Sequence, residues 1–156
     1  MIRYFLFIMV FLLLGCKTTQ ICDFQSSNDN ISHLCGVSTP INDGVFYVNT
    51  EKKEIIIYRV YDATKPWSMM GRWWVFEKPE GSKDEFRSNN AVCDEWSDLS
   101  HVVQATIKKD AIFFIGSTKG VECKDTTYGD TEYLQVFIPQ PKKSLKKVKP
   151  LGEWKE

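Results

Sequence analysis

The sequence predicts a mainly β protein, a small antiparallel β-sandwich or barrel of about six strands with at most one short helix. Three observations predict this class. Short segments rich in β-branched and aromatic residues recur along the chain, turn signals separate them, and only one stretch places apolar residues at helical spacing. An α+β arrangement is the alternative.

The first two predicted strands are residues 45–49 (VFYVN) and 54–61 (EIIIYRVY). A polar four-residue connection separates them, so we expect the two strands to pair as a hairpin. Alternation along the second strand places apolar side chains on both of its faces. We expect the face that carries Ile56, Tyr58 and Val60 to point into the core.

A third strand is predicted at residues 71–77 (GRWWVFE), ahead of a Pro-Glu-Gly turn. Apolar residues at helical spacing then predict a short helix over residues 91–99, with Asn89 or Asn90 as its N-cap. A loop that leads into the next strand fits the same pattern.

Three more strands complete the predicted sheet. Residues 102–107 (VVQATI) and 111–116 (AIFFIG) flank a Lys-Lys-Asp connection, which predicts a second hairpin. The last strand is residues 133–138 (YLQVFI). Two prolines follow it, and proline cannot donate to a sheet ladder, so we expect the sheet to stop there and residues 139–156 to be a mobile tail.

The first sixteen residues have the pattern of an export signal. Arg3 precedes eleven apolar residues, which at about 1.5 Å per residue cover roughly 16 Å, too little for a bilayer core of about 30 Å. Leu13-Leu14-Gly15-Cys16 resembles the lipobox of bacterial lipoproteins. The resemblance implies that Cys16 is the lipid-modified first residue of the mature chain. An ordinary secretory signal, with Cys16 free for a disulfide, is the alternative.

This resemblance sets the expected domain organisation and location. We expect a signal peptide (1–15), a tether with a disulfide-pinned loop (16–41), a β domain (42–138) and a basic tail (139–156). Lys17 follows Cys16 where an aspartate often signals inner-membrane retention. By resemblance, the protein is therefore expected on the outer membrane of a bacterial envelope, facing the periplasm.

With Cys16 assigned to lipid, four cysteines remain, an even number in an oxidising compartment. Three pairings are possible, and we favour Cys22 with Cys35 and Cys93 with Cys123. Zinc is the alternative use of these residues. It typically takes close pairs such as C-x-x-C, and the sequence has none, so we expect no metal.

Charge is divided unevenly along the mature chain. Residues 139–156 contain six lysines and two acidic residues, a net charge of +4, whereas the preceding part is acidic. An acidic body with a basic tail does not resemble a nucleic-acid binder. The tail either stays solvated or contacts anionic lipid, polysaccharide or an acidic partner.

The sequence contains no recognisable catalytic set. His101 follows Asp98 and Ser100, but no nucleophile elbow or glycine-rich phosphate loop is present, and His33 lies in a polar stretch. We read both histidines as ordinary loop or strand-edge residues. The expected protein is therefore not an enzyme and uses no cofactor.

Aromatic residues are the most suggestive feature, because Trp67, Trp73 and Trp74 lie close together. Adjacent Trp73 and Trp74 must point to opposite faces of a strand, so at most one enters a single-sided core. These three residues are candidates for a partner-binding surface; burial on both faces of the sheet is the alternative.

Two functions fit these features. The first is a non-catalytic, lipid-anchored binding protein that recognises or neutralises another envelope or periplasmic protein, as immunity, inhibitor or exclusion lipoproteins do. The second is a structural or assembly accessory of an envelope machine, for which the basic tail would be the docking element.

Overall fold

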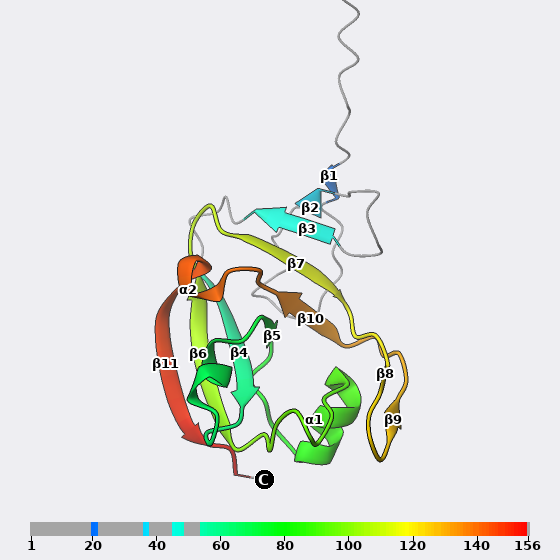
Figure 1. Ribbon diagram of the computed structural model, residues 1–156. Coiled ribbons are helices and arrows are strands. Elements are labelled where there is room, and N and C mark those ends of the chain that lie inside the picture. The colour runs from blue at the N-terminus through cyan, green and yellow to red at the C-terminus, as the bar shows by residue number, and fades with distance from the viewer. Residues whose placement is uncertain (1–19, 22–35, 38–44, 49–53, 156) are drawn as a thin grey trace, which may run out of the picture.

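The computed structural model describes residues 20–21, 36–37, 45–48 and 54–155. They form a nine-stranded antiparallel sheet and a separate two-stranded ribbon, so the predicted β class is confirmed (Figure 1). The sheet is not a closed barrel within the described residues, because β1 and β11 are its two edges. In spatial order its strands are β1 (Gln20–Ile21), β2 (Gly36–Val37), β3 (Val45–Val48), β7 (Ile112–Ser117), β10 (Leu134–Phe137), β5 (Trp73–Val75), β4 (Ile55–Tyr61), β6 (His101–Ile107) and β11 (Leu145–Glu153).

The six strands expected from the sequence are all present, but both expected hairpins are wrong. β3 pairs with β7 and β2, while β4 pairs with β6 and β5. Likewise β6 pairs with β4 and β11, and β7 pairs with β3 and β10. In each expected hairpin the two strands instead lie in different halves of the sheet. Strand propensity located these segments, but it carries no information about which strands become neighbours.

The sheet is sharply bent at β5, a strand of three residues between β10 and β4 (Figure 1). Figure 1 shows β3, β7 and β10 lying across the top of the domain, whereas β4, β6 and β11 run down one side. Both halves contribute to one buried cluster, which contains Ile57 from β4, Val103 from β6 and Phe113 from β7, each fully buried. The bend therefore lets a single sheet enclose its own core, in the manner of a sandwich.

The main core lies on the face of β4 opposite to the one expected. Ile55 and Ile57 are fully buried in it, whereas Ile56 and Tyr58 are only partly buried. Both faces of this strand are apolar, so alternation alone did not decide between them. Val60 belongs to a second, smaller cluster on the other face, together with Leu99, Val102 and Trp154.

Helix α1 (Lys83–Asn90) forms eight residues before the expected helix, and residues 91–99 form turns and loop. The Ser82 hydroxyl accepts a hydrogen bond from the Glu85 amide at 3.1 Å, which caps the first turn. Ser82-x-x-Glu85 is the sequence signature of a capping box and was overlooked. Ala91 has a left-handed φ of 49°, and its conformation ends the helix at the position where the expected one would begin. Asn89 and Asn90 thus close a helix rather than start one.

The sheet also continues beyond Pro139, contrary to expectation. After the short helix α2 (Pro141–Ser144), β11 pairs with β6 along its length, with Leu145 and Trp154 buried near its two ends. β11 is an edge strand, where Pro150 is tolerated because one side of the strand needs no donor. Its pairing shifts between Lys146 and Lys149 and again after Pro150.

The remaining elements are η1 (Pro66–Met70) and the ribbon of β8 (Val121–Glu122) with β9 (Thr127–Tyr128). Among the described residues, none of the helices has the length and apolarity needed to cross a membrane.

Candidate binding cavity

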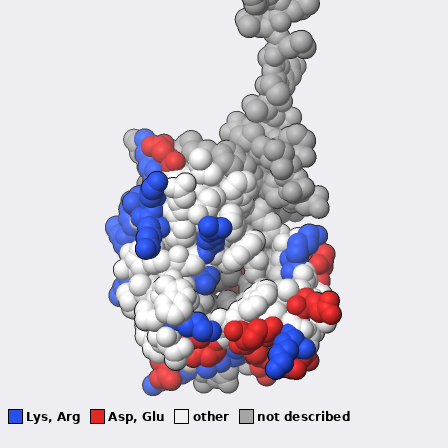
Figure 2. All heavy atoms as spheres, in the orientation of Figure 1, with Lys and Arg blue, Asp and Glu red and all other residues white. Residues whose placement is uncertain are grey.

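A cavity of about 410 Å³ lies where β4 and β5 separate. The two strands pair only at Tyr58 and Val75, after which β5 stays with β10. Tyr58, Val60 and Val75 form part of the cavity lining at this split. The volume falls within the roughly 300–1,000 Å³ typical of pockets that take small molecules or side chains. Figure 2 shows the surface hollowed near the middle of the face on which β5 lies.

One wall of the cavity is the α1–β6 loop, residues 91–100. Arg87, buried at the end of α1, donates to the carbonyl oxygens of Val92 (3.2 Å) and Ser97 (2.7 Å) and pairs with Asp94 at 2.8 Å. These contacts fix the loop against the end of α1. Hydrogen bonds from a charged donor such as the guanidinium are stronger than hydrogen bonds between neutral groups. Val92, Trp96 and Leu99 of this loop line the cavity.

A disulfide joins this wall to the next one. Cys93 and Cys123 are bonded, with Cα atoms 5.5 Å apart, which is the pairing expected of these two residues. Cys123 follows β8, whose Val121 also lines the cavity. The Glu95 carboxylate also accepts from the Lys124 amide at 3.1 Å. The bridge therefore holds two cavity walls that lie about thirty residues apart in the chain.

Arg59 lies at the split between β4 and β5. Its Nε donates to the Ser68 carbonyl at 2.7 Å, and its Nη1 donates to the Trp73 carbonyl at 2.6 Å. The guanidinium lies against Gly71, where any Cβ would be within 2.4 Å of it. Burial lowers the pKa of Arg59 to about 10, so the side chain remains charged at neutral pH.

The tryptophans divide as strand alternation requires. Trp74 is 1 % exposed and donates from Nε1 to the Gly71 carbonyl at 2.8 Å, so its side chain belongs to the core, although the residue also forms part of the cavity lining. Trp73 is 54 % exposed, lines the cavity and packs on Phe137 at 4.8 Å between ring centroids. Trp67 is 76 % exposed on η1, next to Ser68 of the cavity lining. Of the three residues predicted for a partner-binding surface, Trp67 and Trp73 are thus exposed.

Sequence reasoning missed Trp96, which is 54 % exposed and lines the cavity from the α1–β6 loop. The helix expected over residues 91–99 includes Trp96, whereas α1 is found at Lys83–Asn90, so Trp96 lies in the loop that follows it. Its backbone carbonyl accepts from Lys65 Nζ at 3.3 Å, which connects this loop to the segment before Trp67.

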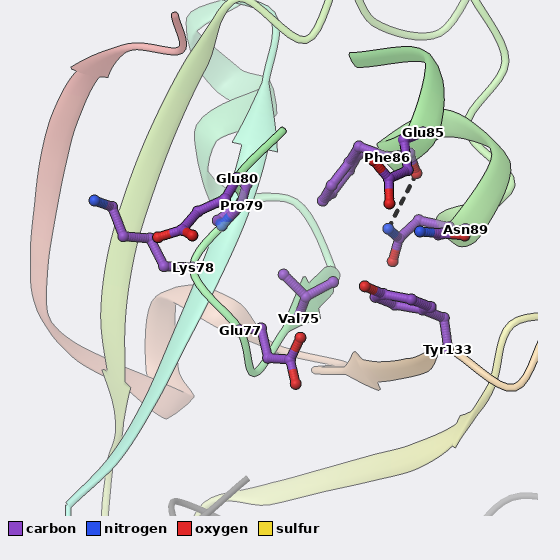
Figure 3. A pocket seen from close by; sticks show the side chains of 10 residues that line it. Val75, Glu77, Lys78, Pro79, Glu80, Glu85, Phe86, Asn89 and Tyr133 are labelled. Carbon is purple, nitrogen blue, oxygen red and sulfur yellow. Dashed lines mark hydrogen bonds between the residues drawn. The ribbon is translucent and has the colours of Figure 1, made fainter. Parts of the chain in front are cut away.

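A smaller cavity of about 60 Å³ lies on the other side of Val75, Phe86 and Asn90, which line both (Figure 3). Glu77 and Glu80, from the loop between β5 and α1, and Glu85, from α1, are among its lining residues (Figure 3). Their carboxylates do not converge as metal ligands would. Among the described residues, Cys93, Glu95 and Cys123 do converge, but both sulfurs are already used in the disulfide.

The residues that suggested a catalytic relay do not form one. The Ser100 hydroxyl accepts from the Ala63 amide at 3.0 Å, and Asp98 accepts from the Ser100 amide at 2.9 Å, so both serve the backbone of a turn. His101 packs against Tyr61. His33, Cys16, Cys22 and Cys35 lie outside the described residues.

Comparison with known proteins adds no family to this description, since no family model, no curated protein and no solved structure matches the chain.

Proposed function

We propose that this protein is a non-catalytic, lipid-anchored binding protein of the bacterial envelope that recognises another protein through the β4–β5 cavity. The observation that carries the proposal is the cavity itself, with exposed Trp73 and Trp96 in its lining and Trp67 beside it. Exposed tryptophans around a concave site are the residues that most often carry binding energy between proteins.

The construction of the site also supports binding. Arg87, Arg59 and the Cys93–Cys123 bridge each fix a part of the lining. A preformed site loses little conformational entropy when a partner docks, which favours affinity. Immunity, inhibitor or exclusion activity would each need this kind of rigid recognition surface.

The anchor is tested by Cys16→Ser in the full chain, expressed in its bacterial host. We expect the variant to leave the membrane fraction, because one cysteine carries the whole lipid attachment. Fractionation followed by detection of the protein measures this, with Ser26→Ala as the matched control in the same N-terminal stretch. An unchanged membrane fraction would contradict lipidation at Cys16.

The binding surface is tested by photo-crosslinking in the anchored, full-length protein. A photoreactive residue replaces Trp96 in one strain and Ile112, which is exposed on β7 and outside the cavity lining, in another. We expect one discrete crosslinked protein from position 96 and none from position 112.

The same experiment examines the accessory alternative, which the basic side chains over α2 and β11 in Figure 2 favour. Photoreactive residues at Lys146 and Lys149 probe that edge. A partner captured there, and not at position 96, would replace the cavity proposal with the accessory one. No capture at any position would contradict both.

A further inference from the structure

Six lysines gather at one end of the domain, where the β6–β7 turn meets α2 and the start of β11. The backbone amide of Lys108 donates to the Ser144 carbonyl at 2.8 Å, and its Nζ donates to the Lys143 carbonyl at 2.8 Å, so the turn is held against α2. Figure 2 shows the basic side chains of this region together at the upper left. The basic cluster, as we name this surface, consists of Lys108, Lys109, Lys142, Lys143, Lys146 and Lys147.

Neighbouring carboxylates neutralise the basic cluster only in part. Its segments contain one acidic residue, Asp110, and Glu54 reaches it from the start of β4, so six lysines face two carboxylates and the net charge is +4. Glu54 is shared, because its Oε1 lies 3.5 Å from Lys146 Nζ and 2.6 Å from Lys147 Nζ. The exposed lysines of the cluster that take part in no ion pair between described residues are Lys109, Lys142 and Lys143. An unbalanced positive surface of this kind attracts an anionic one.

The basic cluster lies on the side of the domain to which the proposed lipid anchor is attached. Gln20 of β1 is four residues after Cys16, and four residues span at most about 14 Å. The register of β1, β2, β3 and β7 aligns Gln20 with Phe114 across three strand spacings, about 15 Å. β7 follows directly on the turn that carries two lysines of the cluster. Figure 1 shows β1, this turn and α2 in the upper half of the domain, so a membrane that holds the anchor lies on the same side.

We propose that the basic cluster binds the anionic phospholipid headgroups of the membrane in which Cys16 is anchored, and that this contact fixes the orientation of the domain. Lysines close to a membrane are attracted by its anionic lipids, and the attraction is limited to about a Debye length, which the short chain before β1 satisfies. This inference rests on the proposed function, because it requires the anchor. The α1–β6 loop and β8, which line the cavity, lie in the lower half of Figure 1, so the docked domain leaves the cavity open to a partner.

The test uses the lipidated protein, purified from its host and reconstituted into vesicles of phosphatidylcholine alone or of phosphatidylcholine with phosphatidylglycerol. A water-soluble reagent acylates exposed lysines, and mass spectrometry reads the rate at each position. Because each lysine beside an anionic surface strengthens binding by about fivefold, we expect acylation of the cluster to slow by at least about fivefold in the anionic vesicles. Exposed lysines outside the cluster should react equally in both; they are Lys78, Lys124 and Lys155. Equal rates at the cluster in the two vesicles would overturn the proposal.

Two triple variants with the same change in charge assign the contact. Glutamine at the three unpaired lysines of the cluster should abolish the protection of Lys146 and Lys147 in anionic vesicles, since the surface then retains too little charge. Glutamine at the three control lysines should leave that protection unchanged. Rising salt should also remove the protection in the wild-type protein, because an exposed electrostatic contact is screened. Protection that persists in the cluster variant or in high salt would contradict a charge-dependent contact with lipid.

The outcome separates this inference from the proposed function. If the protein stays on both kinds of vesicle but the cluster is equally reactive in each, the lipid contact is wrong and the anchored, cavity-binding protein stands. If the cluster is unprotected on vesicles and a photoreactive residue at position 146 captures a protein in cells, the occupant is an acidic protein and not the membrane. If the protein associates with neither kind of vesicle, the anchor is absent and both proposals fail.

Discussion

Arg87 shows how a single side chain can determine the shape of a loop. It is 8 % exposed, yet its guanidinium reaches Val92 and Ser97 carbonyls and the Asp94 carboxylate. The sequence places an arginine in a region of mixed charge, and nothing in residue type distinguishes it from Arg72, which is exposed. Its role follows from the αL turn at Ala91, which folds the chain back over the helix end.

We expect Arg87→Ala to lower the free energy of unfolding by about 2–4 kcal/mol, because two carbonyls and a carboxylate lose their donor together. Urea denaturation of the wild type and the variant measures the change. Arg72→Ala serves as the control and should shift stability by less than about 0.5 kcal/mol. Equal shifts in the two variants would contradict the role assigned to Arg87.

Asp62, in the turn between β4 and η1, makes a pH-dependent contribution to the stability of the protein. Its carboxylate accepts from the Thr64 hydroxyl and amide, and it pairs with Lys65 at 3.1 Å. The pKa of Asp62 lies below its ordinary value, and the largest cause is the hydrogen bond from the Thr64 hydroxyl. The hydrogen bond from Lys65, the hydrogen bond from the Thr64 amide and the positive charge of Lys65 lower it further.

A carboxyl group whose pKa is lower in the folded state stabilises the protein at pH values above its unfolded-state pKa of about 4. This stabilisation disappears as the pH falls through the folded-state pKa. We therefore expect Asp62→Asn to be less stable than wild type at pH 7, with the difference shrinking below about pH 4. Urea midpoints measured at both pH values provide the comparison. A difference that stays constant with pH would show that the carboxylate charge is not responsible.

At the scale of elements, strand locations were predictable and strand partners were not. β-branched and aromatic runs marked β4, β6 and β7 within one or two residues, because half-buried pleated surfaces favour those side chains. The pairing of β6 with β11 depends on a segment of lysines and a proline whose local preference is against a strand. Tertiary contacts of Leu145 and Trp154 overcome that preference.

The disulfide is also a tertiary contact between elements, because it joins the α1–β6 loop to the end of β8. It closes a loop of about thirty residues, for which the chain-entropy model gives about 4 kcal/mol. We expect the double variant Cys93→Ser, Cys123→Ser to lose about 2–4 kcal/mol in chemical denaturation without reductant. The single variant Cys93→Ser should lose as much, since one partner is enough to break the bond.

If the bridge also shapes the cavity, the double variant should weaken binding beyond its effect on folding. Affinity for the crosslinked partner, measured under conditions where the variant is fully folded, reports this. Unchanged affinity would limit the bridge to a role in stability.

For the whole molecule, the tryptophan site could be foreseen only in part. The sequence indicated that Trp73 and Trp74 point in opposite directions, but not which of them faces the core. The cavity itself arises because β4 and β5 part beyond Tyr58 and Val75, and Arg59 occupies the split. No local pattern encodes the separation of two strands that have eleven residues between them in the chain and share a single paired position.

The C-terminal segment gives the strongest prediction at this scale. Leu145 is 4 % exposed in the main core, and Trp154 is 6 % exposed in the second cluster. The C-terminal segment is therefore packed into the folded domain at both ends of β11. We expect truncation after Gln140 to abolish cooperative unfolding, because it removes both anchors and leaves β6 as an unpaired edge. Circular dichroism during heating measures this loss.

Substituting the charges without removing the strand provides the matched control. The side chains of Lys142, Lys143, Lys146 and Lys149 are exposed, and the ion pair of Lys146 with Glu54 at 3.5 Å is a surface contact. Surface pairs contribute little, so glutamine at these four positions should leave the melting temperature nearly unchanged. The variant should instead aggregate more readily, because lysines along an edge strand hinder pairing with a second chain. A truncated protein that still unfolds cooperatively would show that β11 is dispensable for folding.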